Sequence, residues 1–311
     1  MKADMKILAV MLFVASFAMS CGSSAENKKD KKKLSYEQYE LNRPVKSIDV
    51  RTYEASSKFG EVIKGKPTYG NYLAEFDKVG NLIKRTDYLR DGDIFVVYKC
   101  VYDKKNNMIE ETSYSGEGEQ TSLVQNEYNA DGKLLKSVSY DKDGNMDQCY
   151  ENAYEDGCLR RSKRVEYEDD GTVVETEWIN KWNGEILLER SLYRNEELIS
   201  VYKFSDYKAD SMAKGVEYDA EGVKQREFYE ESGKFGVVLM KSHSCVDGSE
   251  SEYRVERNKL GHVVYIYNSA SDKKETYYEY EYDSNDNWIK KVEFQGVIRK
   301  PVEIVEREIK Y

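Results

Sequence analysis

The sequence predicts an all-β fold in which a long antiparallel meander of repeated hairpins forms an open sheet that curls or coils. Three observations lead to this fold class. A turn motif recurs along most of the chain, the segments between turns alternate apolar and polar residues, and no long segment beyond residue 20 has the period of a helix. Alternation with a period of two is typical of a strand with one buried face.

Residues 1–20 have the features of a bacterial lipoprotein signal peptide. Lys2 and Lys6 precede a twelve-residue apolar run over 7–18, which is shorter than the ~20 residues that a membrane-spanning helix needs. The segment Ala18-Met19-Ser20-Cys21 resembles a lipobox, and this resemblance implies that Cys21 carries acyl chains such as palmitate. Because Ala18 and Met19 depart from the usual pattern, the alternative is that Cys21 is an ordinary residue after a plain signal peptide.

The residues that follow predict a tether and then a single β-repeat domain over 34–311. Residues 21–33 are polar and rich in lysine, which is typical of a solvated spacer. Residues 34–70 match the repeat poorly and predict an N-terminal cap. The repeats occupy 71–294, and 295–311 predicts a capping strand without a turn motif.

The repeat unit is a strand followed by a tight turn. Its clearest copies are Phe76 to Leu82, Tyr140 to Met146 and Tyr282 to Trp288. An aromatic residue closes a strand, and the Asp beside it can form an Asx turn with the backbone. Gly or Asn four residues after the aromatic supplies a positive φ, and an apolar residue two positions later opens the next strand. This spacing predicts roughly twenty strands from residue 34 onward.

The unit aromatic-Asp-x-x-Gly-Asn-apolar resembles the YD repeat of bacterial RHS-type proteins. Together with the lipobox-like start, it is similar to small envelope lipoproteins of Bacteroides-type bacteria. The RHS resemblance implies a long, coiled β-ribbon, which in the large members encloses a toxic cargo. This chain is far shorter and lacks the Asp-Pro-x-Gly-Leu core signature of the family, since its prolines are Pro44, Pro67 and Pro301. We therefore do not expect toxin delivery, and the YD motif contributes no catalytic residue.

The composition disfavours several classes of function. The chain has 58 acidic against 48 basic residues and a net charge of −10, so its surface should repel nucleic acids. With Cys21 acylated, four cysteines remain, which either form disulfides or stay as buried thiols: Cys100, Cys149, Cys158 and Cys245. No CxxC pair or EF-hand loop is present, so we predict neither a metal nor a cofactor.

The sequence also lacks a recognisable catalytic motif. Nucleotide-binding glycine loops, HExxH and GxSxG are absent. His243 and Ser244 are neighbours, but adjacent residues of a strand point to opposite faces. We therefore predict that the protein is not an enzyme. The candidate ligand platform consists of two tyrosine rows, each on one face of its own strand: Tyr265 and Tyr267, and Tyr278, Tyr280 and Tyr282. The same rows could instead form a packed core.

The function that we expect is a non-enzymatic binding or scaffold lipoprotein of the bacterial cell envelope, anchored to the outer membrane through its lipid. Its expected partners are the membrane and an envelope protein or glycan. Two alternatives remain open. One is a glycan-active or accessory enzyme of a nutrient-uptake system, and the other is an immunity or chaperone partner of a secreted toxin.

Overall fold

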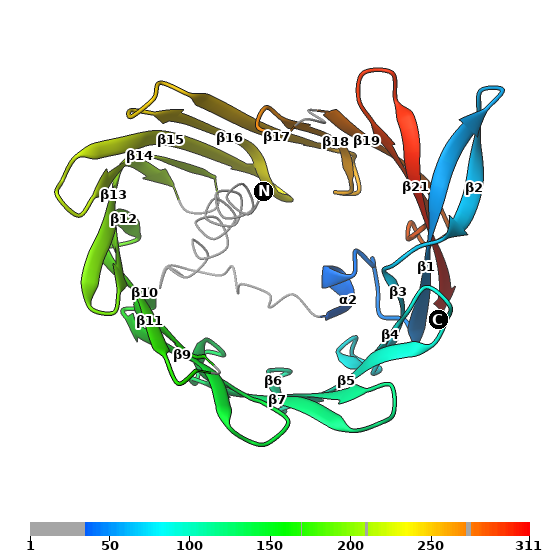
Figure 1. Ribbon diagram of the computed structural model, residues 1–311, viewed down its shortest axis with the longest axis horizontal. Coiled ribbons are helices and arrows are strands. Elements are labelled where there is room, and N and C mark those ends of the chain that lie inside the picture. Colours follow the sequence, from blue (N-terminus) through cyan, green and yellow to red (C-terminus); the bar gives the residue numbers. More distant parts are fainter. Residues whose placement is uncertain (1–34, 169, 209–210, 272–274) are drawn as a thin grey trace. The chain divides into compact units, whose positions relative to one another are not determined.

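The computed structural model describes residues 35–168, 170–208, 211–271 and 275–311 (Figure 1). The chain divides into two compact units. The described part of the first unit is 35–149, 256–267, 271 and 275–311, and that of the second is 150–168, 170–208, 211–255 and 268–270.

The first unit contains a short helix, α2 (Ser35–Gln38), and most of the strands at both ends of the chain. Its strands are β1 (Ser47–Lys58), β2 (Glu61–Pro67), β3 (Asn71–Phe76), β4 (Leu82–Tyr88), β5 (Ile94–Tyr102), β6 (Met108–Ser115), β7 (Gln120–Tyr128), β8 (Leu134–Tyr140), β18 (Val263–Asn268), β19 (Glu275–Tyr282), β20 (Trp288–Gln295) and β21 (Lys300–Lys310).

The second unit is a meander of consecutive antiparallel strands. Its strands are β10 (Cys158–Tyr167), β11 (Val173–Asn183), β12 (Ile186–Arg194), β13 (Glu197–Lys208), β14 (Met212–Asp219), β15 (Lys224–Gly233) and β16 (Gly236–Ser244). The strands β9 (Met146–Glu155) and β17 (Glu250–Arg257) are divided between the units, and the last residue of β18, Asn268, belongs to the second. No helix among the described residues is long and apolar enough to cross a membrane.

The turns have the chemistry that the repeat motif predicts. Asp77 Oδ1 accepts hydrogen bonds from the backbone N–H groups of Val79, Gly80 and Asn81, at 2.8 to 2.9 Å. Gly80 has a φ of 104°, and β4 begins two residues later. The prediction of Asx turns between strands is confirmed, and the twenty-one strands found among the described residues agree with the roughly twenty expected.

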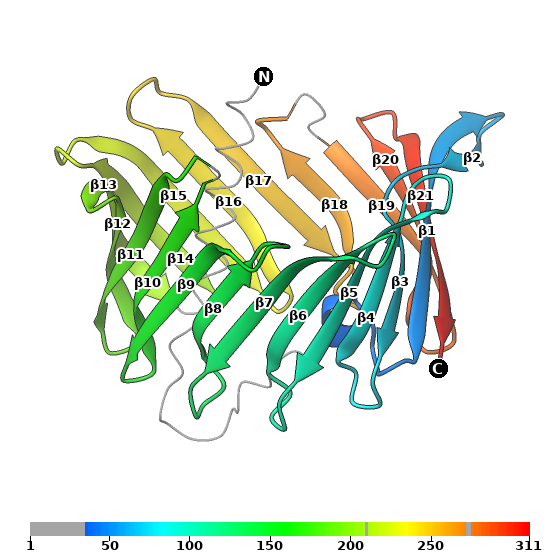
Figure 2. The same ribbon diagram turned by 60° about the horizontal axis from the view of Figure 1, so that its bottom comes forward.

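The sheet is closed, so the prediction of an open, curled sheet is wrong. Strand pairing places all twenty-one strands in one sheet. The last strand, β21, pairs with the first, β1, from Ser47–Lys310 to Glu54–Glu303 (Figure 2). The other edge of β1 pairs with β3 near its start and with β2 beyond Tyr53. Closure removes the two unpaired edges that an open meander would expose.

A hydrophobic core in the first unit forms between the sheet and residues 35–46, the segment that leads into β1. Leu41 and Val45 from this segment are 3% and 4% exposed, and they pack in one cluster with Ile48, Phe76 and Trp288. The backbone N–H of Tyr36 donates to the carbonyl of Gly80 at 3.0 Å, which fixes α2 beside the β3–β4 turn (Figure 1). Residues 35–46 therefore cover one face of the sheet at this place.

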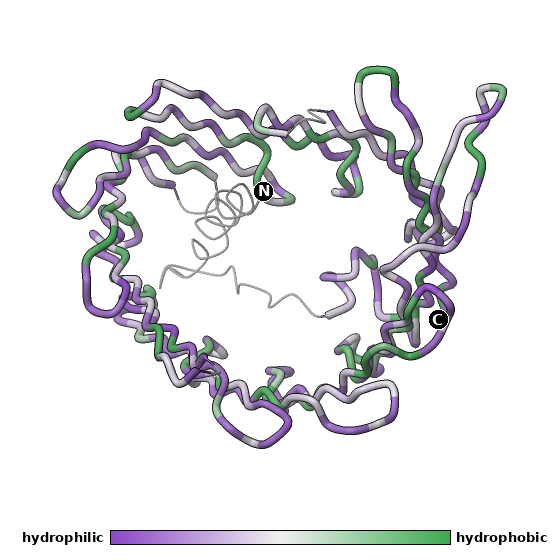
Figure 3. Tube along the Cα trace, in the orientation of Figure 1, coloured by the Kyte–Doolittle hydropathy of each residue, from purple (hydrophilic) through white to green (hydrophobic). Residues whose placement is uncertain are grey.

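Polar and apolar residues are interspersed along the strands (Figure 3). On β4, Lys84 pairs with Glu75 at 3.1 Å, whereas its neighbour Arg85 pairs with Asp87 at 2.6 Å. Since neighbouring residues of a strand point to opposite faces, each face of β4 carries an ion pair. In the second unit, Lys163 and Arg164 of β10 form ion pairs in the same way.

Candidate ligand-binding site

The predicted lipidation site, Cys21, lies outside the described residues. Three of the remaining cysteines, Cys100, Cys149 and Cys245, are reduced and form no disulfide. The candidate platform of five tyrosines lies within the described part of the first unit.

The structure places the two tyrosine rows on opposite faces of the sheet. Tyr265 of β18 stands directly opposite Tyr277 of β19, and their ring centres are 5.0 Å apart. Tyr265 and Tyr267 therefore share a face with Tyr277. Tyr278 follows Tyr277 in the same strand, so it points to the other face. The five tyrosines do not form one surface.

Tyr280 and Tyr282 are part of the core of the first unit. Their rings stack on each other with centres 6.0 Å apart, and the ring of His262 lies against both. The Tyr280 hydroxyl donates to the carbonyl of Val263 at 2.8 Å, and burial raises the pKa of that hydroxyl. The Tyr282 hydroxyl accepts from Asn258 Nδ2 at 2.7 Å. These contacts occupy the two rings, as the packing alternative predicts for this part of the row.

A cavity of about 440 Å³ lies where β18 and β19 separate. The paired residues of these strands run from Tyr267–Glu275 to Tyr265–Tyr277, and the cavity begins beyond the last pair. Tyrosine side chains and three charged residues line it, together with one valine: Glu256, Val264, Tyr265, Tyr277, Tyr278, Glu279 and Arg299. Two of the predicted tyrosines, Tyr265 and Tyr278, therefore meet at this cavity although they lie on opposite faces.

Five of the seven residues that line this site were not predicted from the sequence, among them Tyr277 and Arg299. The Arg299 guanidinium lies 4.2 Å from the centre of the Tyr277 ring, within the range of a cation–π contact. Residue 299 lies outside the repeats, at the β20–β21 turn, so its approach to β19 depends on the pairing of β20 with its two neighbours. The tyrosine doublet Tyr277-Tyr278 was visible in the sequence, but only the register shows which tyrosine faces which strand.

Hydrogen bonds fix the rings of Tyr265 and Tyr277, which lie on one side of the cavity. The hydroxyls of Tyr265 and Tyr277 both donate to the carboxylate of Glu275, at 3.3 Å and 3.2 Å. The carboxylates of Glu256 and Glu279 are exposed at the cavity lining. The site thus offers aromatic faces, carboxylates that accept hydrogen bonds and a guanidinium that donates them. This combination suits a ligand that is rich in hydroxyl groups.

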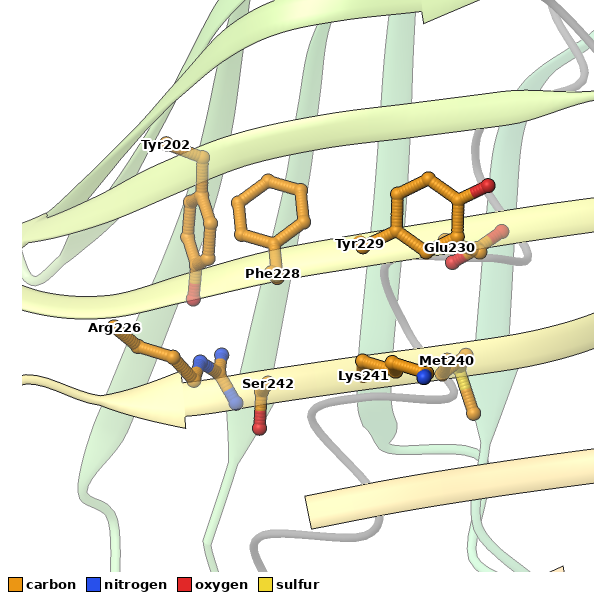
Figure 4. Close-up of a pocket in the computed structure, with 8 residues that line it drawn as sticks. All are labelled: Tyr202, Arg226, Phe228, Tyr229, Glu230, Met240, Lys241 and Ser242. Atoms are coloured by element: carbon orange, nitrogen blue, oxygen red, sulfur yellow. The ribbon is translucent and has the colours of Figure 1, made fainter. Parts of the chain in front are cut away.

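The second unit has a smaller hollow on β13, β15 and β16 (Figure 4). Its volume is about 40 Å³, which holds a few water molecules. Arg226 pairs with Glu217 at 2.7 Å, and the Tyr202 hydroxyl donates to the same carboxylate at 2.8 Å. Burial raises the pKa of Glu230 at its edge. A monosaccharide would not fit here, so the cavity of the first unit is the better candidate.

The described residues hold no group of three or more His, Cys, Asp or Glu side chains that could bind a metal ion. His243 is half-exposed, and its Nδ1 lies 3.7 Å from Glu250 Oε1 on the neighbouring strand. Ser244 follows it at the end of β16, and its hydroxyl oxygen accepts weak hydrogen bonds from the N–H groups of Val246 and Asp247 at 3.4 Å.

Comparisons with known proteins find similarity to solved structures. No family model matches the chain. No curated protein matches it either. A porin-like protein from Bacteroides uniformis is 10% identical, with 86% of this chain and 98% of that chain covered and a TM-score of 0.34. A porin-like protein from Bacteroides vulgatus is also 10% identical with the same coverage, at a TM-score of 0.27. The Tc holotoxin pore of Photorhabdus luminescens is 13% identical over 75% of this chain and 19% of that chain, at a TM-score of 0.18.

The predicted membership in the YD-repeat, RHS-like envelope lipoproteins is wrong. No such family model matches the chain, and the pairing of β1 with β21 closes the sheet. The resemblance implied an open, coiled ribbon instead. A tight hairpin turn needs an Asp that accepts hydrogen bonds from the turn and a residue with positive φ. The motif supplies these two residues, and unrelated β-proteins can share it for the same reason. The alternative of a toxin immunity or chaperone partner rested on this resemblance and loses its support.

Proposed function

We propose that this protein is a non-enzymatic glycan-binding lipoprotein of the bacterial cell envelope, anchored at the outer membrane through Cys21. The observation that carries the proposal is the cavity between β18 and β19. Its volume of about 440 Å³ lies within the usual range for small-molecule sites. Its tyrosine rings and exposed carboxylates suit the apolar faces and the hydroxyl groups of a sugar.

The position of the charges supports attachment through the N-terminus. A sheet that spans a bilayer needs one apolar face along its membrane-spanning band. Strands β4 and β10 carry ion pairs on both faces, so neither of them offers such a face. The lipobox-like segment around Cys21 supplies a different means of attachment.

Screening the purified chain on a glycan array tests the proposal. We expect binding to a restricted set of glycans, and we expect Tyr278→Ala to weaken that binding at least tenfold. Tyr278→Phe keeps the ring and should retain most of the affinity, which separates stacking from misfolding. Tyr69→Ala is the matched control, because Tyr69 is 73% exposed and lies outside the cavity. Binding that is absent, or equal in all four proteins, would contradict the proposal.

A second candidate function, a glycan-active enzyme, is favoured by one observation. Two exposed carboxylates, Glu256 and Glu279, line the same cavity as the tyrosines, and glycoside hydrolysis uses a pair of carboxyl groups. Incubation of the purified chain with the array-positive glycan, followed by measurement of new reducing ends, decides between the two. Turnover that disappears in Glu256→Gln or Glu279→Gln would establish the enzyme. We expect no turnover.

A further inference from the structure

Two neighbouring hairpins of the first unit expose bulky apolar side chains at their tips. Phe59, at the tip of the β1–β2 hairpin, is 96% exposed. Val297 and Ile298, at the tip of the β20–β21 hairpin, are 82% and 88% exposed. Both hairpins extend at the same end of the unit, because β21 pairs with β1 (Figure 2). Single exposed apolar residues are common on protein surfaces, but a group of three this exposed is not.

Phe59 also occupies an unfavourable backbone conformation. Its φ is 55°, and that of Gly60 is 84°. A two-residue hairpin turn with both φ values positive favours Asn-Gly or Gly-Gly, and a bulky side chain at the first position is strained. The Lys58 ammonium lies 5.6 Å from the centre of the Phe59 ring, so a neighbouring charge is close to it but does not bury it. The folded chain thus holds an aromatic ring in water, in a strained turn.

Basic residues surround these tips although the chain as a whole has a net charge of −10. Residues 56–67 and 295–300 contain one acidic residue, Glu61, and five basic residues: Lys58, Lys64, Lys66, Arg299 and Lys300. Lys64 pairs with Glu306 at 2.6 Å, and Arg299 lies over Tyr277. Lys58 and Lys300 are exposed beside the apolar tips, and Lys66 is exposed nearer the base of the β1–β2 hairpin.

We propose that these two tips form a membrane-docking surface that inserts into the interface of an anionic lipid bilayer. Phe59, Val297 and Ile298 enter the boundary between the headgroups and the acyl chains, while the lysines contact lipid phosphates. Apolar side chains flanked by lysines are the combination that binds anionic membrane interfaces. A lipid surface fits better than a protein partner, because the tips are protruding points and basic residues outnumber acidic ones around them. This inference does not depend on the glycan cavity or on acylation of Cys21.

Local tryptophan fluorescence in the full-length chain tests this surface independently of any other membrane attachment. Phe59→Trp places a reporter at the tip, and Val246→Trp places one on another exposed turn, where Val246 is 72% exposed. The chains are mixed with vesicles of phosphatidylglycerol and phosphatidylethanolamine that contain brominated lipid. We expect strong quenching of the emission added by Phe59→Trp and little quenching of that added by Val246→Trp. An unquenched reporter at residue 59 would overturn the proposal. It would do so even if the tips were later found to bind a protein.

A charge-reversal variant tests the role of the lysines. Changing Lys58, Lys66 and Lys300 to Glu in the Phe59→Trp chain should raise the lipid concentration for half-maximal quenching at least tenfold. Raising the salt concentration should have the same effect in the parent chain, since salt screens exposed charges. Quenching that is insensitive to both changes would overturn the electrostatic half of the proposal. Circular dichroism checks that each variant is folded.

Discussion

The turn residues show how single side chains set the fold. Asp77 replaces backbone partners by binding three N–H groups of its own turn, and its other oxygen accepts from Asn81 Nδ2 at 2.9 Å. Asn81 is 2% exposed, and its amide also donates to Asn106 Oδ1, in the turn between β5 and β6, at 3.0 Å. The sequence predicts the first set of bonds because they are local. The link between these two turns depends on how the strands lie side by side and was not predicted.

Replacing Asp77 should destabilise the protein measurably. We expect Asp77→Ala to lower the free energy of unfolding by about 2 kcal/mol, since hydrogen bonds to a charged group are worth about 1.5–3 kcal/mol. Asp91→Ala is the matched control, because Asp91 Oδ1 accepts a single turn bond, from Asp93 N–H at 3.2 Å. The control should lose less than about 0.5 kcal/mol. Urea denaturation measures both, and equal losses would contradict this role of the Asp77 bonds.

The Asp77 carboxylate also makes the free energy of unfolding depend on pH. Burial alone would raise the pKa of Asp77, but hydrogen bonds from Asn81, Gly80 and Val79 outweigh it and lower the pKa below the usual value of 3.8. A lowered folded-state pKa contributes stability that is present above the unfolded pKa. That contribution is lost as the pH falls from about 4 through the folded pKa. Between about pH 5 and 2.5, wild-type stability should therefore fall more steeply than that of Asp77→Ala.

Glu303 makes the opposite contribution. Burial, and then the charge of Glu293 directly opposite on β20, raises the pKa of Glu303. The folded state therefore takes up this proton more readily than the unfolded chain, and lowering the pH from about 7 toward 4.5 favours folding at this site. We expect Glu303→Gln to stabilise the protein at about pH 7 by about 0.5–1 kcal/mol, the range for cross-strand pairs. Glu61→Gln, on an exposed hairpin tip, should change little, and a destabilised Glu303→Gln would contradict the argument.

At the level of the elements, the hairpins could be predicted from the sequence, but the register in which neighbouring strands pair could not. The strands follow from alternation within short segments, and the turns follow from the local repeat motif. The register of β19 against β18 places Tyr265 opposite Tyr277, and this fact alone assigns the tyrosines to faces. A register shift between Glu281 and Tyr282 also interrupts the alternation of β19. The sequence contains no local signal for either feature. The prediction made from it therefore placed too many tyrosines in the platform and missed Tyr277.

The segment that leads into β1 is held against the turns by close packing. Gly80 has a φ of 104°, and a Cβ at this position would meet the ring of Tyr36. Gly92, at the equivalent turn between β4 and β5, has a φ of 99° and open space around it. Both substitutions to Ala strain the backbone alike, so their difference reports the contact with Tyr36. We expect Gly80→Ala to cost about 1–3 kcal/mol more than Gly92→Ala. Equal losses in urea denaturation would show that Tyr36 moves away freely.

For the whole molecule, closure of the sheet was beyond the reach of local patterns. Residues 47–58 do not follow the repeat, yet they pair along one edge with residues near position 310. Closure depends on the apolar residues of β1, such as Ile48 and Val50, which are 0% and 3% exposed against residues of β3 and β21. Repeats predict the neighbours of each strand in a meander. They do not predict whether its two ends meet.

Attachment that survives a high-salt wash should depend on a single residue near the N-terminus, because salt screens the charges through which the hairpin tips contact lipid. Because strands β4 and β10 carry ion pairs on both faces, we do not expect these strands to span the bilayer. Cys21→Ser should move most of the protein from the membrane fraction to the soluble fraction of a bacterial host, as assayed by immunoblotting. Replacing the exposed Cys245 by Ser serves as the control and should leave the distribution unchanged. Retention of Cys21→Ser in membranes after carbonate washing would contradict the proposed anchor.

The measurement that tests the central claim most directly is a crystal structure of the chain with an array-positive glycan. The proposed function predicts density for a sugar ring in the cavity between β18 and β19, stacked on Tyr265 or Tyr278 and within hydrogen-bonding distance of Glu256 or Glu279. Density for the glycan at another site, with this cavity unaltered, would contradict it.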